Sequence, residues 1–183
     1  DVAVVGGGPA GTSAARAAAE HDVSVLVLEK GVPRADREEL GPDSTDAAGF
    51  LDYWVDLAGF DPTELPKDVI ERVLTGAEFH GPTESVTLDQ TGIPSSYPHF
   101  GFTFNRTKFD DWLRARAIES GVEYGVGSSV TGVETNQSGQ FIHELSLSDG
   151  STVRAESLVL ADGPQRQITI PVLDRYLDDG MKA

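Results

Sequence analysis

The first thirty residues alternate between short apolar runs and a stretch of small residues. Residues 1–5 and 23–28 form two apolar runs, and residues 12–19 between them are rich in alanine. Short continuous apolar runs are typical of strands buried on both faces, whereas an alanine-rich stretch favours a helix. The pattern therefore predicts a strand, a helix and a second strand that lies parallel to the first.

The middle of the chain is expected to contain a loop and two short helices. Polar residues with prolines and glycines predict an extended loop over 31–43. Ser44 or Thr45 can cap the first helix, which would end at Gly59, and Pro66 suits the first turn of the second. The expected apolar sides carry Phe50, Trp54, Leu57 and Ala58 in the first helix, and Val69, Ile70 and Val73 in the second.

A third helix is predicted further along the chain. Thr107 with Asp110 three residues later forms a plausible capping box, and Gly121 marks the end of the helix. Its apolar face would carry Phe109, Trp112, Leu113 and Ala117. We expect Trp54 and Trp112, both on apolar helix faces, to belong to the core.

The remaining apolar segments read as strands. Short strands are expected at 85–88 and 100–104. Strands at 126–135 and 141–147, separated by a turn at 136–139 and followed by a turn at 149–150, would form a meander. A buried strand at 157–160 runs into Ala161-Asp162-Gly163-Pro164.

Composition and charge exclude several classes of function. The 183 residues carry 30 acidic and 14 basic side chains, a formal net charge of −16, which disfavours binding to nucleic acids and to anionic lipid surfaces. The absence of cysteine excludes disulfides, thiolate metal sites and a cysteine nucleophile. No apolar run approaches the length of a membrane span, so any membrane contact is expected to be peripheral.

The distribution of charged residues along the chain suggests the environment of the protein. Carboxylates are scattered along the whole chain and Arg outnumbers Lys ten to four, which resembles the surface of a halophilic cytoplasmic protein. An acidic protein from a low-salt organism is the alternative. The chain begins at Asp1 inside an expected strand and ends at Ala183 without a closing element, so we expect a segment of a longer protein.

A glycine-rich turn between the first strand and the first helix carries the main functional signal. Gly6, Gly8 and Gly11 form a G-x-G-x-x-G pattern, and Glu29 stands at the end of the second strand. Gly6 permits a tight turn, Gly8 lets a pyrophosphate approach the backbone, and Gly11 allows close packing of helix on strand. The residues that we assign to dinucleotide binding here are Gly6, Gly8, Pro9, Ala10, Gly11, Glu29 and Lys30.

The same segment indicates which dinucleotide is bound. The Glu29 carboxylate suits the free ribose hydroxyls of NAD or FAD and would repel the 2′-phosphate of NADP. A domain that binds NAD would continue with further strand–helix units, whereas this chain leaves the sheet for about 75 residues before the helix at Thr107. The long detour favours FAD.

Three landmarks together resemble a known family. Residues 6–11, 105–110 and 160–164 resemble successive motifs of FAD-dependent oxidoreductases with the fold of p-hydroxybenzoate hydroxylase, within which the chain is most similar to the geranylgeranyl reductases. The resemblance implies a Rossmann-like α/β FAD-binding domain with a β-meander. It also implies the reduction of carbon–carbon double bonds in isoprenoid lipids, with electrons from an external donor such as NAD(P)H or ferredoxin.

The resemblance also implies further site residues. Arg106 would lie beside the FAD diphosphate or ribityl chain, Val130 would contact the adenine through its backbone, and Asp162 and Gly163 would lie near the ribityl chain and pyrophosphate. Many members carry a cysteine after the second strand, but residues 38–44 contain none. We therefore name no catalytic residue and no metal ligand.

Alternatives remain at this stage. On the residues alone, Asp162-Gly163 is also a common turn pair, and Arg106 could be a surface cation. His80 and His99 lack partners at the spacing of metal ligands. Residues 1–183 would form the amino-terminal part of a two-domain flavoprotein, with about 41–105 contributing to the substrate or cap region. An aromatic-ring monooxygenase of the same fold, or a dinucleotide-binding module without activity of its own, are the competing functions.

Overall fold

The computed structural model describes residues 1–32, 47–59, 61–136 and 142–174. The chain divides into two compact units: unit 1 comprises 1–40 and 113–183, and unit 2 comprises 41–112. The loop expected at 31–43, the expected caps Ser44 and Thr45 and most of the turn expected at 136–139 lie outside the described residues.

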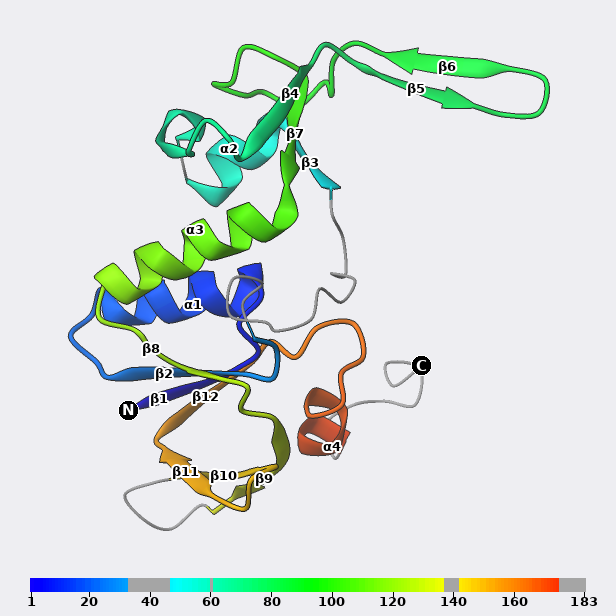
Figure 1. Cartoon of the computed structure of the whole chain (residues 1–183). Coiled ribbons are helices and arrows are strands. Elements are labelled where there is room, and N and C mark those ends of the chain that lie inside the picture. Colours follow the sequence, from blue (N-terminus) through cyan, green and yellow to red (C-terminus); the bar gives the residue numbers. More distant parts are fainter. Residues whose placement is uncertain (33–46, 60, 137–141, 175–183) are drawn as a thin grey trace. The chain divides into compact units, whose positions relative to one another are not determined.

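Unit 1 contains a four-stranded parallel sheet with the strand order β12-β1-β2-β8. The helix α1 connects β1 to β2 and lies against them (Figure 1). This arrangement confirms the predicted strand, helix and parallel strand at the start of the chain. The elements are β1 (Val2–Val5), α1 (Pro9–Ala19), β2 (Val25–Glu29), β8 (Glu123–Val126) and β12 (Ser157–Leu160).

Small side chains let α1 pack closely on the sheet. Gly11, Thr12 and Ala15 are its buried residues, and Ala15 joins a core cluster with Val4 and Val27 from the central strands. These two valines have no exposed surface on the face that α1 covers, and Val5 and Leu28 are buried on the opposite face in a second cluster with Leu145. The apolar runs of the sequence therefore reflect a doubly covered parallel sheet.

Unit 1 also contains an antiparallel meander of β9 (Val130–Thr135), β10 (His143–Leu147) and β11 (Thr152–Ala155). Leu145 and Leu147 are buried, as the alternation predicts. The prediction of one strand over 126–135 is wrong. The chain turns at Gly127, whose φ of +69° favours glycine, so β8 ends in the parallel sheet and β9 begins in the meander.

Unit 2 is built on a small antiparallel sheet with the strand order β3-β7-β4. The hairpin of β5 and β6 extends away from this sheet (Figure 1). The strands predicted at 85–88 and 100–104 are confirmed, the second with a shift of one residue. The elements are β3 (Ala47–Leu51), α2 (Asp52–Ala58), the 3-10 helix η2 (Pro62–Glu64), β4 (Ile70–Leu74), β5 (Ala77–His80), β6 (Ser85–Leu88) and β7 (Gly101–Asn105).

Two predictions for the middle of the chain are wrong. Phe50 lies in β3 opposite Phe102, with the two rings stacked at 5.6 Å, so the first helix begins only at Asp52. Its end at Gly59, which has a φ of +63°, is confirmed. The second expected helix is replaced by β4, because pairing with β7 outweighs the local signal at Pro66.

The expected core position of Trp54 is also wrong. Trp54 and Leu57 on α2 have 43% and 68% of their surface exposed, whereas Val55 is buried. The later start of the helix explains why Trp54 is exposed. Phe50 belongs to β3 and is therefore not part of the apolar face of α2. Trp112 lies half-buried beside the buried Phe109, with ring centroids 5.8 Å apart.

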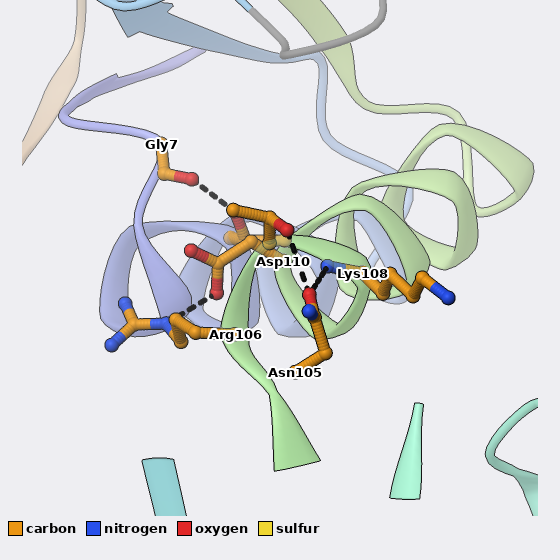
Figure 2. Close-up of polar contacts among 7 residues, drawn as sticks. Gly7, Asn105, Arg106, Lys108 and Asp110 are labelled. Carbon is orange, nitrogen blue, oxygen red and sulfur yellow. Dashed lines mark hydrogen bonds and ion pairs between the residues drawn. The ribbon is translucent and has the colours of Figure 1, made fainter. Parts of the chain in front are cut away.

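The helix α3 (Arg106–Glu119) is confirmed, but its cap differs from the prediction. The side-chain oxygen of Asn105 accepts hydrogen bonds from the Lys108 amide at 3.1 Å and from the Thr107 hydroxyl at 2.7 Å (Figure 2). Asn105 is therefore the capping residue, and Asp110 instead accepts a bond from Arg106 Nε at 2.8 Å. The expected capping box at Thr107 is wrong.

The segment after β12 is held by Asp162. The Asp162 carboxylate accepts hydrogen bonds from the Ile168 amide at 2.7 Å, from the Thr169 amide at 3.0 Å and from the Thr169 hydroxyl at the start of α4 (Thr169–Leu173). Partial burial acts to raise the pKa of Asp162, but these hydrogen bonds outweigh it and the pKa lies below its ordinary value. The ionised carboxylate thus stabilises the fold locally.

We predict that Asp162→Asn lowers the free energy of unfolding at pH 7 by about 1 kcal/mol, a net value for partly exposed hydrogen bonds. A carboxyl with a depressed folded pKa stabilises the native state above its unfolded pKa of about 3.9 and loses this effect as the pH falls through the folded value. The difference between variant and wild type, measured by urea unfolding, should therefore close below about pH 4. Asp89→Asn, at an exposed position, is the matched control; a difference that stays constant with pH would contradict the assignment.

Candidate dinucleotide-binding site

The junction of β1 and α1 leaves room only for glycine at two positions. Gly6 has a φ of +99°, and a Cβ placed there would lie 2.3 Å from the carbonyl oxygen of Ala161. A Cβ at Gly11 would lie 1.9 Å from the carbonyl oxygen of Gly6. The first and third glycines therefore allow the tight turn and the close packing of helix on strand that their spacing predicts.

The second glycine faces open space. A Cβ at Gly8 would meet no atom within 4 Å, although its neighbours Gly6 and Gly11 are closely surrounded. Gly8 is also the residue before the first turn of α1, and no side chain caps the helix there. The amides of that first turn have no partner within the helix, and the helix dipole is positive at this end. The space and the donors fit a diphosphate group.

Glu29 is tied to the backbone at the carboxyl end of β2. Its Oε2 accepts a hydrogen bond from the Gly7 amide, and its Oε1 accepts one from the Gly31 amide, both at 2.6 Å. These bonds fix the orientation of the carboxylate, and each oxygen keeps a further acceptor position. Glu29 can therefore accept hydrogen bonds from a pair of ribose hydroxyls beside the glycine turn.

A small cleft in unit 1 opens at the carboxyl ends of these strands. Two backbone hydrogen bonds attach the loop after β8 to the end of β2. The Ser128 amide donates to the Glu29 carbonyl at 3.0 Å, and the Gly127 amide donates to the Gly31 carbonyl at 3.2 Å. The cleft thus gathers residues from distant parts of the chain. Its lining includes Gly6, Glu29, Lys30, Val130 and Asp162 from the sequence prediction, and Ser128, Ser129, Gln167 and Ile168, which the prediction missed.

The other residues named from the sequence lie as follows. Pro9 and Ala10 form the first turn of α1, where the fixed φ of Pro9 suits the helix start. Gly163 is exposed and has a φ of +78°. Arg106 belongs to unit 2 and pairs with Asp110 in the first turns of α3 (Figure 2).

Two residues that the sequence analysis missed support the glycine turn. The Thr12 hydroxyl donates to the Gly7 carbonyl at 3.0 Å, drawn as the dashed line at Gly7 in Figure 2, and the Tyr124 hydroxyl donates to Thr12 Oγ1 at 3.0 Å. A polar residue among the small residues of α1 was the available signal for Thr12. Nothing local marks Tyr124, because its position depends on the pairing of β8 with β2.

His80 and His99 belong to unit 2, where His80 Nε2 lies 3.6 Å from Glu78 Oε2. Within the described ranges, no three side chains of His, Cys, Asp or Glu come together as a metal site requires. In the same part of the chain, no helix is long and apolar enough to cross a membrane.

The chain is similar to several proteins named digeranylgeranylglycerophospholipid reductase. It is 28% identical to digeranylgeranylglycerophospholipid reductase 1 of Methanosphaera stadtmanae over 90% of its length, and 32% identical to the reductase of that name from Thermoplasma volcanium over 89%. These alignments cover 38% and 39% of the two relatives, so the chain spans well under half of their length.

Solved structures agree with the fold. A geranylgeranyl bacteriochlorophyll reductase-like protein from Thermoplasma acidophilum superposes with a TM-score of 0.72 at 28% identity, over 92% of this chain and 40% of the other. A 2-methyl-3-hydroxypyridine-5-carboxylic acid oxygenase shares the fold, with a TM-score of 0.64 at 22% identity over 91% of this chain and 40% of the other. The family model described as FAD dependent oxidoreductase matches residues 1–163. The chain therefore belongs to the FAD dependent oxidoreductase family, whose cofactor is FAD.

Proposed function

We propose that the full protein is a reductase of carbon–carbon double bonds in isoprenoid lipids, and that unit 1 holds its FAD. The observation that carries the cofactor site is the open space at Gly8. This residue lies between the closely packed Gly6 and Gly11 and directly follows Gly7, whose amide donates to the Glu29 carboxylate. The similarity to digeranylgeranylglycerophospholipid reductases supports the substrate class.

The proposed binding mode uses backbone groups for the phosphates. The amides of Gly8, Ala10 and Gly11 would donate to the FAD diphosphate, and Pro9, which has no N–H, would set the entry of the helix. Glu29 would accept hydrogen bonds from the adenosine ribose. The same carboxylate would repel a 2′-phosphate, so the site would discriminate against NADP.

Further residues would complete the site. Lys30 and the backbone of Val130, both in the lining of the cleft, would contact the adenosine part of FAD. Arg106 would contact the diphosphate or ribityl chain. The Asp162 carboxylate already accepts three hydrogen bonds, so we propose that Asp162 and Gly163 meet the ribityl chain and pyrophosphate through their backbone.

The protein's part in the reaction would be to bind and orient. Bound FAD supplies the two-electron redox chemistry, with electrons from an external donor such as NAD(P)H or ferredoxin. Unit 1 would hold the adenosine and diphosphate end of the cofactor, so that its reactive ring occupies a constant position. We propose a cytoplasmic location with peripheral membrane contact, because the proposed substrate is a lipid. The net charge of −16 would make this contact depend on salt, which screens the repulsion from an anionic surface.

We further propose that residues 41–105 contribute to the substrate or cap region. Unit 2 contains a hollow of about 820 Å³, within the range of ligand sites. Val55, Leu65, Ile70 and Val73 give its lining an apolar part, and Asp56, Asp61 and Lys67 line it too. The apolar part would contact the isoprenoid chain.

The function can be tested on the protein expressed at its full natural length and kept in high salt. We expect absorbance bands near roughly 370 and 450 nm that bleach with anaerobic dithionite, and release of FAD on denaturation. Anaerobic incubation of the protein with digeranylgeranylglycerophospholipid and excess dithionite, which supplies two electrons for each reduction, should then add two hydrogen atoms to each double bond that is reduced, as mass spectrometry would show. Oxygen consumption coupled to NAD(P)H with an aromatic substrate would favour a monooxygenase instead. FAD binding without turnover of either kind would indicate a binding module.

Gly8→Val should remove FAD binding without unfolding the protein. The backbone at Gly8 has a φ of −71° and a ψ of −179°, which valine tolerates, and the new methyl groups would fill the space left for the diphosphate. We expect the affinity for FAD to fall roughly 100-fold or more, about 2.7 kcal/mol, in fluorescence titrations of the apoprotein. Gly132→Val in β9, also with open space at its Cβ, should bind FAD as the wild type does. Unchanged FAD content in Gly8→Val would overturn the site.

Val73→Trp should fill the hollow in unit 2. Val73 lines the hollow and has 45% of its surface exposed, so a larger ring can be placed there without disturbing the core. We expect the KM for the isoprenoid lipid to rise about tenfold, about 1.4 kcal/mol, with FAD content unchanged. Leu57→Trp, an exposed apolar position on α2 outside the lining, is the control. Equal KM values for the two variants would argue against a substrate role for this hollow.

A further inference from the structure

Side chains hold both backbone polar groups of Gly7, which lies in the dinucleotide turn. Its amide donates to Glu29 Oε2 at 2.6 Å, and its carbonyl accepts a hydrogen bond from the Thr12 hydroxyl at 3.0 Å. The side chain of Glu29 also packs against this residue, since a Cβ at Gly7 would lie 3.0 Å from the Glu29 Cβ. Gly7 immediately precedes Gly8, so its orientation determines where the chain enters α1.

The Thr12 hydroxyl is in turn held from a third element. Thr12 is 2% exposed, and its Oγ1 accepts a hydrogen bond from the Tyr124 hydroxyl at 3.0 Å. A hydroxyl has one proton to donate. Because the Gly7 carbonyl can only accept, the single proton of Thr12 is directed at it, and the Tyr124 hydroxyl donates to Thr12. The chain of donors therefore runs in one direction, from Tyr124 to Thr12 to Gly7.

Tyr124 is suited to act as the first donor in this chain. It lies in β8, which pairs with β2 so that Tyr124 stands opposite Val27, and its ring packs on the buried cluster around Val4 and Ala15. Burial raises the pKa of the Tyr124 phenol and outweighs the Thr12 hydrogen bond and the Arg114 charge, which act to lower it, so the hydroxyl keeps its proton at neutral pH. The sheet thus fixes the position of the ring, so the Tyr124 hydroxyl stays in place as the donor to Thr12 Oγ1.

We propose that Tyr124 is a positioning residue for the cofactor: through Thr12 it fixes the Gly7 carbonyl and so preorganises the dinucleotide turn to bind FAD. A turn that is already ordered loses less conformational freedom when the ligand binds, which strengthens binding without a further contact to the ligand. Glu29 holds the amide side of the same residue. The inference rests on the proposed FAD site in unit 1.

The test uses Tyr124→Phe, which removes the hydroxyl and keeps the ring, in the protein at its full natural length. Loss of one neutral hydrogen bond should weaken FAD binding by the apoprotein about 2- to 10-fold. Thr12→Val, which leaves the Gly7 carbonyl without its donor, should weaken it further, whereas Thr12→Ser should restore affinity close to that of the wild type. Tyr53→Phe on α2 is the matched control and should leave the affinity unchanged.

A double-mutant cycle separates positioning from simple stabilisation. If Tyr124 acts through Thr12, adding Tyr124→Phe to Thr12→Val should change the dissociation constant of FAD by less than twofold. A purely structural role would lower the melting temperature of the apoprotein and leave FAD affinity unchanged in Tyr124→Phe. That result, or full additivity in the cycle, would overturn the proposal. Should Thr12→Val fail to fold, Tyr124→Phe and Thr12→Ser still decide between the outcomes.

The two proposals fail in different ways. If wild-type protein binds no FAD, the cofactor site in unit 1 is wrong and the role of Tyr124 falls with it. If wild-type protein binds FAD and Gly8→Val does not, but Tyr124→Phe binds it with wild-type affinity, the site stands and only the positioning role is refuted.

Discussion

The close approach of α1 to the end of β1 is the contact on which the architecture of unit 1 depends. A side chain at Gly11 would collide with the Gly6 carbonyl, and one at Gly6 would collide with the backbone at Ala161. Because both positions are glycine, the helix can lie against the sheet with its amino terminus directly after the strand. The carboxyl ends of β1, β2 and β12 consequently meet at one edge, where parallel sheets place their ligands. Loss of this contact would move the amino terminus of α1 away from this edge.

Elements defined by local signals could be predicted from the sequence. The strand–helix–strand start follows from apolar runs and glycine spacing, both contained within thirty residues, and the strand at 157–160 is marked by its own composition. The G-x-G-x-x-G turn and Glu29 were found for the same reason. The structure places Val130 and Asp162 in the lining of the same cleft, although these two came from the family resemblance and not from periodicity. Their contacts with FAD stay predictions.

Elements defined by distant pairing could not be predicted. Phe50 and residues 70–74 fit a helical spacing, but each forms a strand because β7, at 101–105, lies between them and pairs with both. Sheet formation here overrides the local preference, as tertiary contacts often do. The roles of Tyr124 and Asp162 were hidden in the same way, since a hydrogen bond to Thr12 crosses 112 residues and the bonds of Asp162 depend on how the next turn folds back.

A site for a diphosphate in a chain of net charge −16 requires attraction at short range. Among the described residues that line the cleft, Lys30 is the sole cation, and Glu29 and Asp162 contribute two carboxylates. In the proposed site, the backbone amides at the start of α1 would provide most of the attraction, beside the contact proposed for Arg106. Amides are neutral overall and act within a few ångströms, where scattered surface carboxylates contribute little in salt. This design makes the orientation of the turn decisive, because a rotated amide loses its interaction whereas a flexible lysine would follow its ligand. In the proposed site, the partly buried hydrogen bonds around Gly7 would therefore be the structural requirement that accompanies an acidic surface. Where affinity depends mainly on fixed dipoles, the dipoles themselves must be held in place.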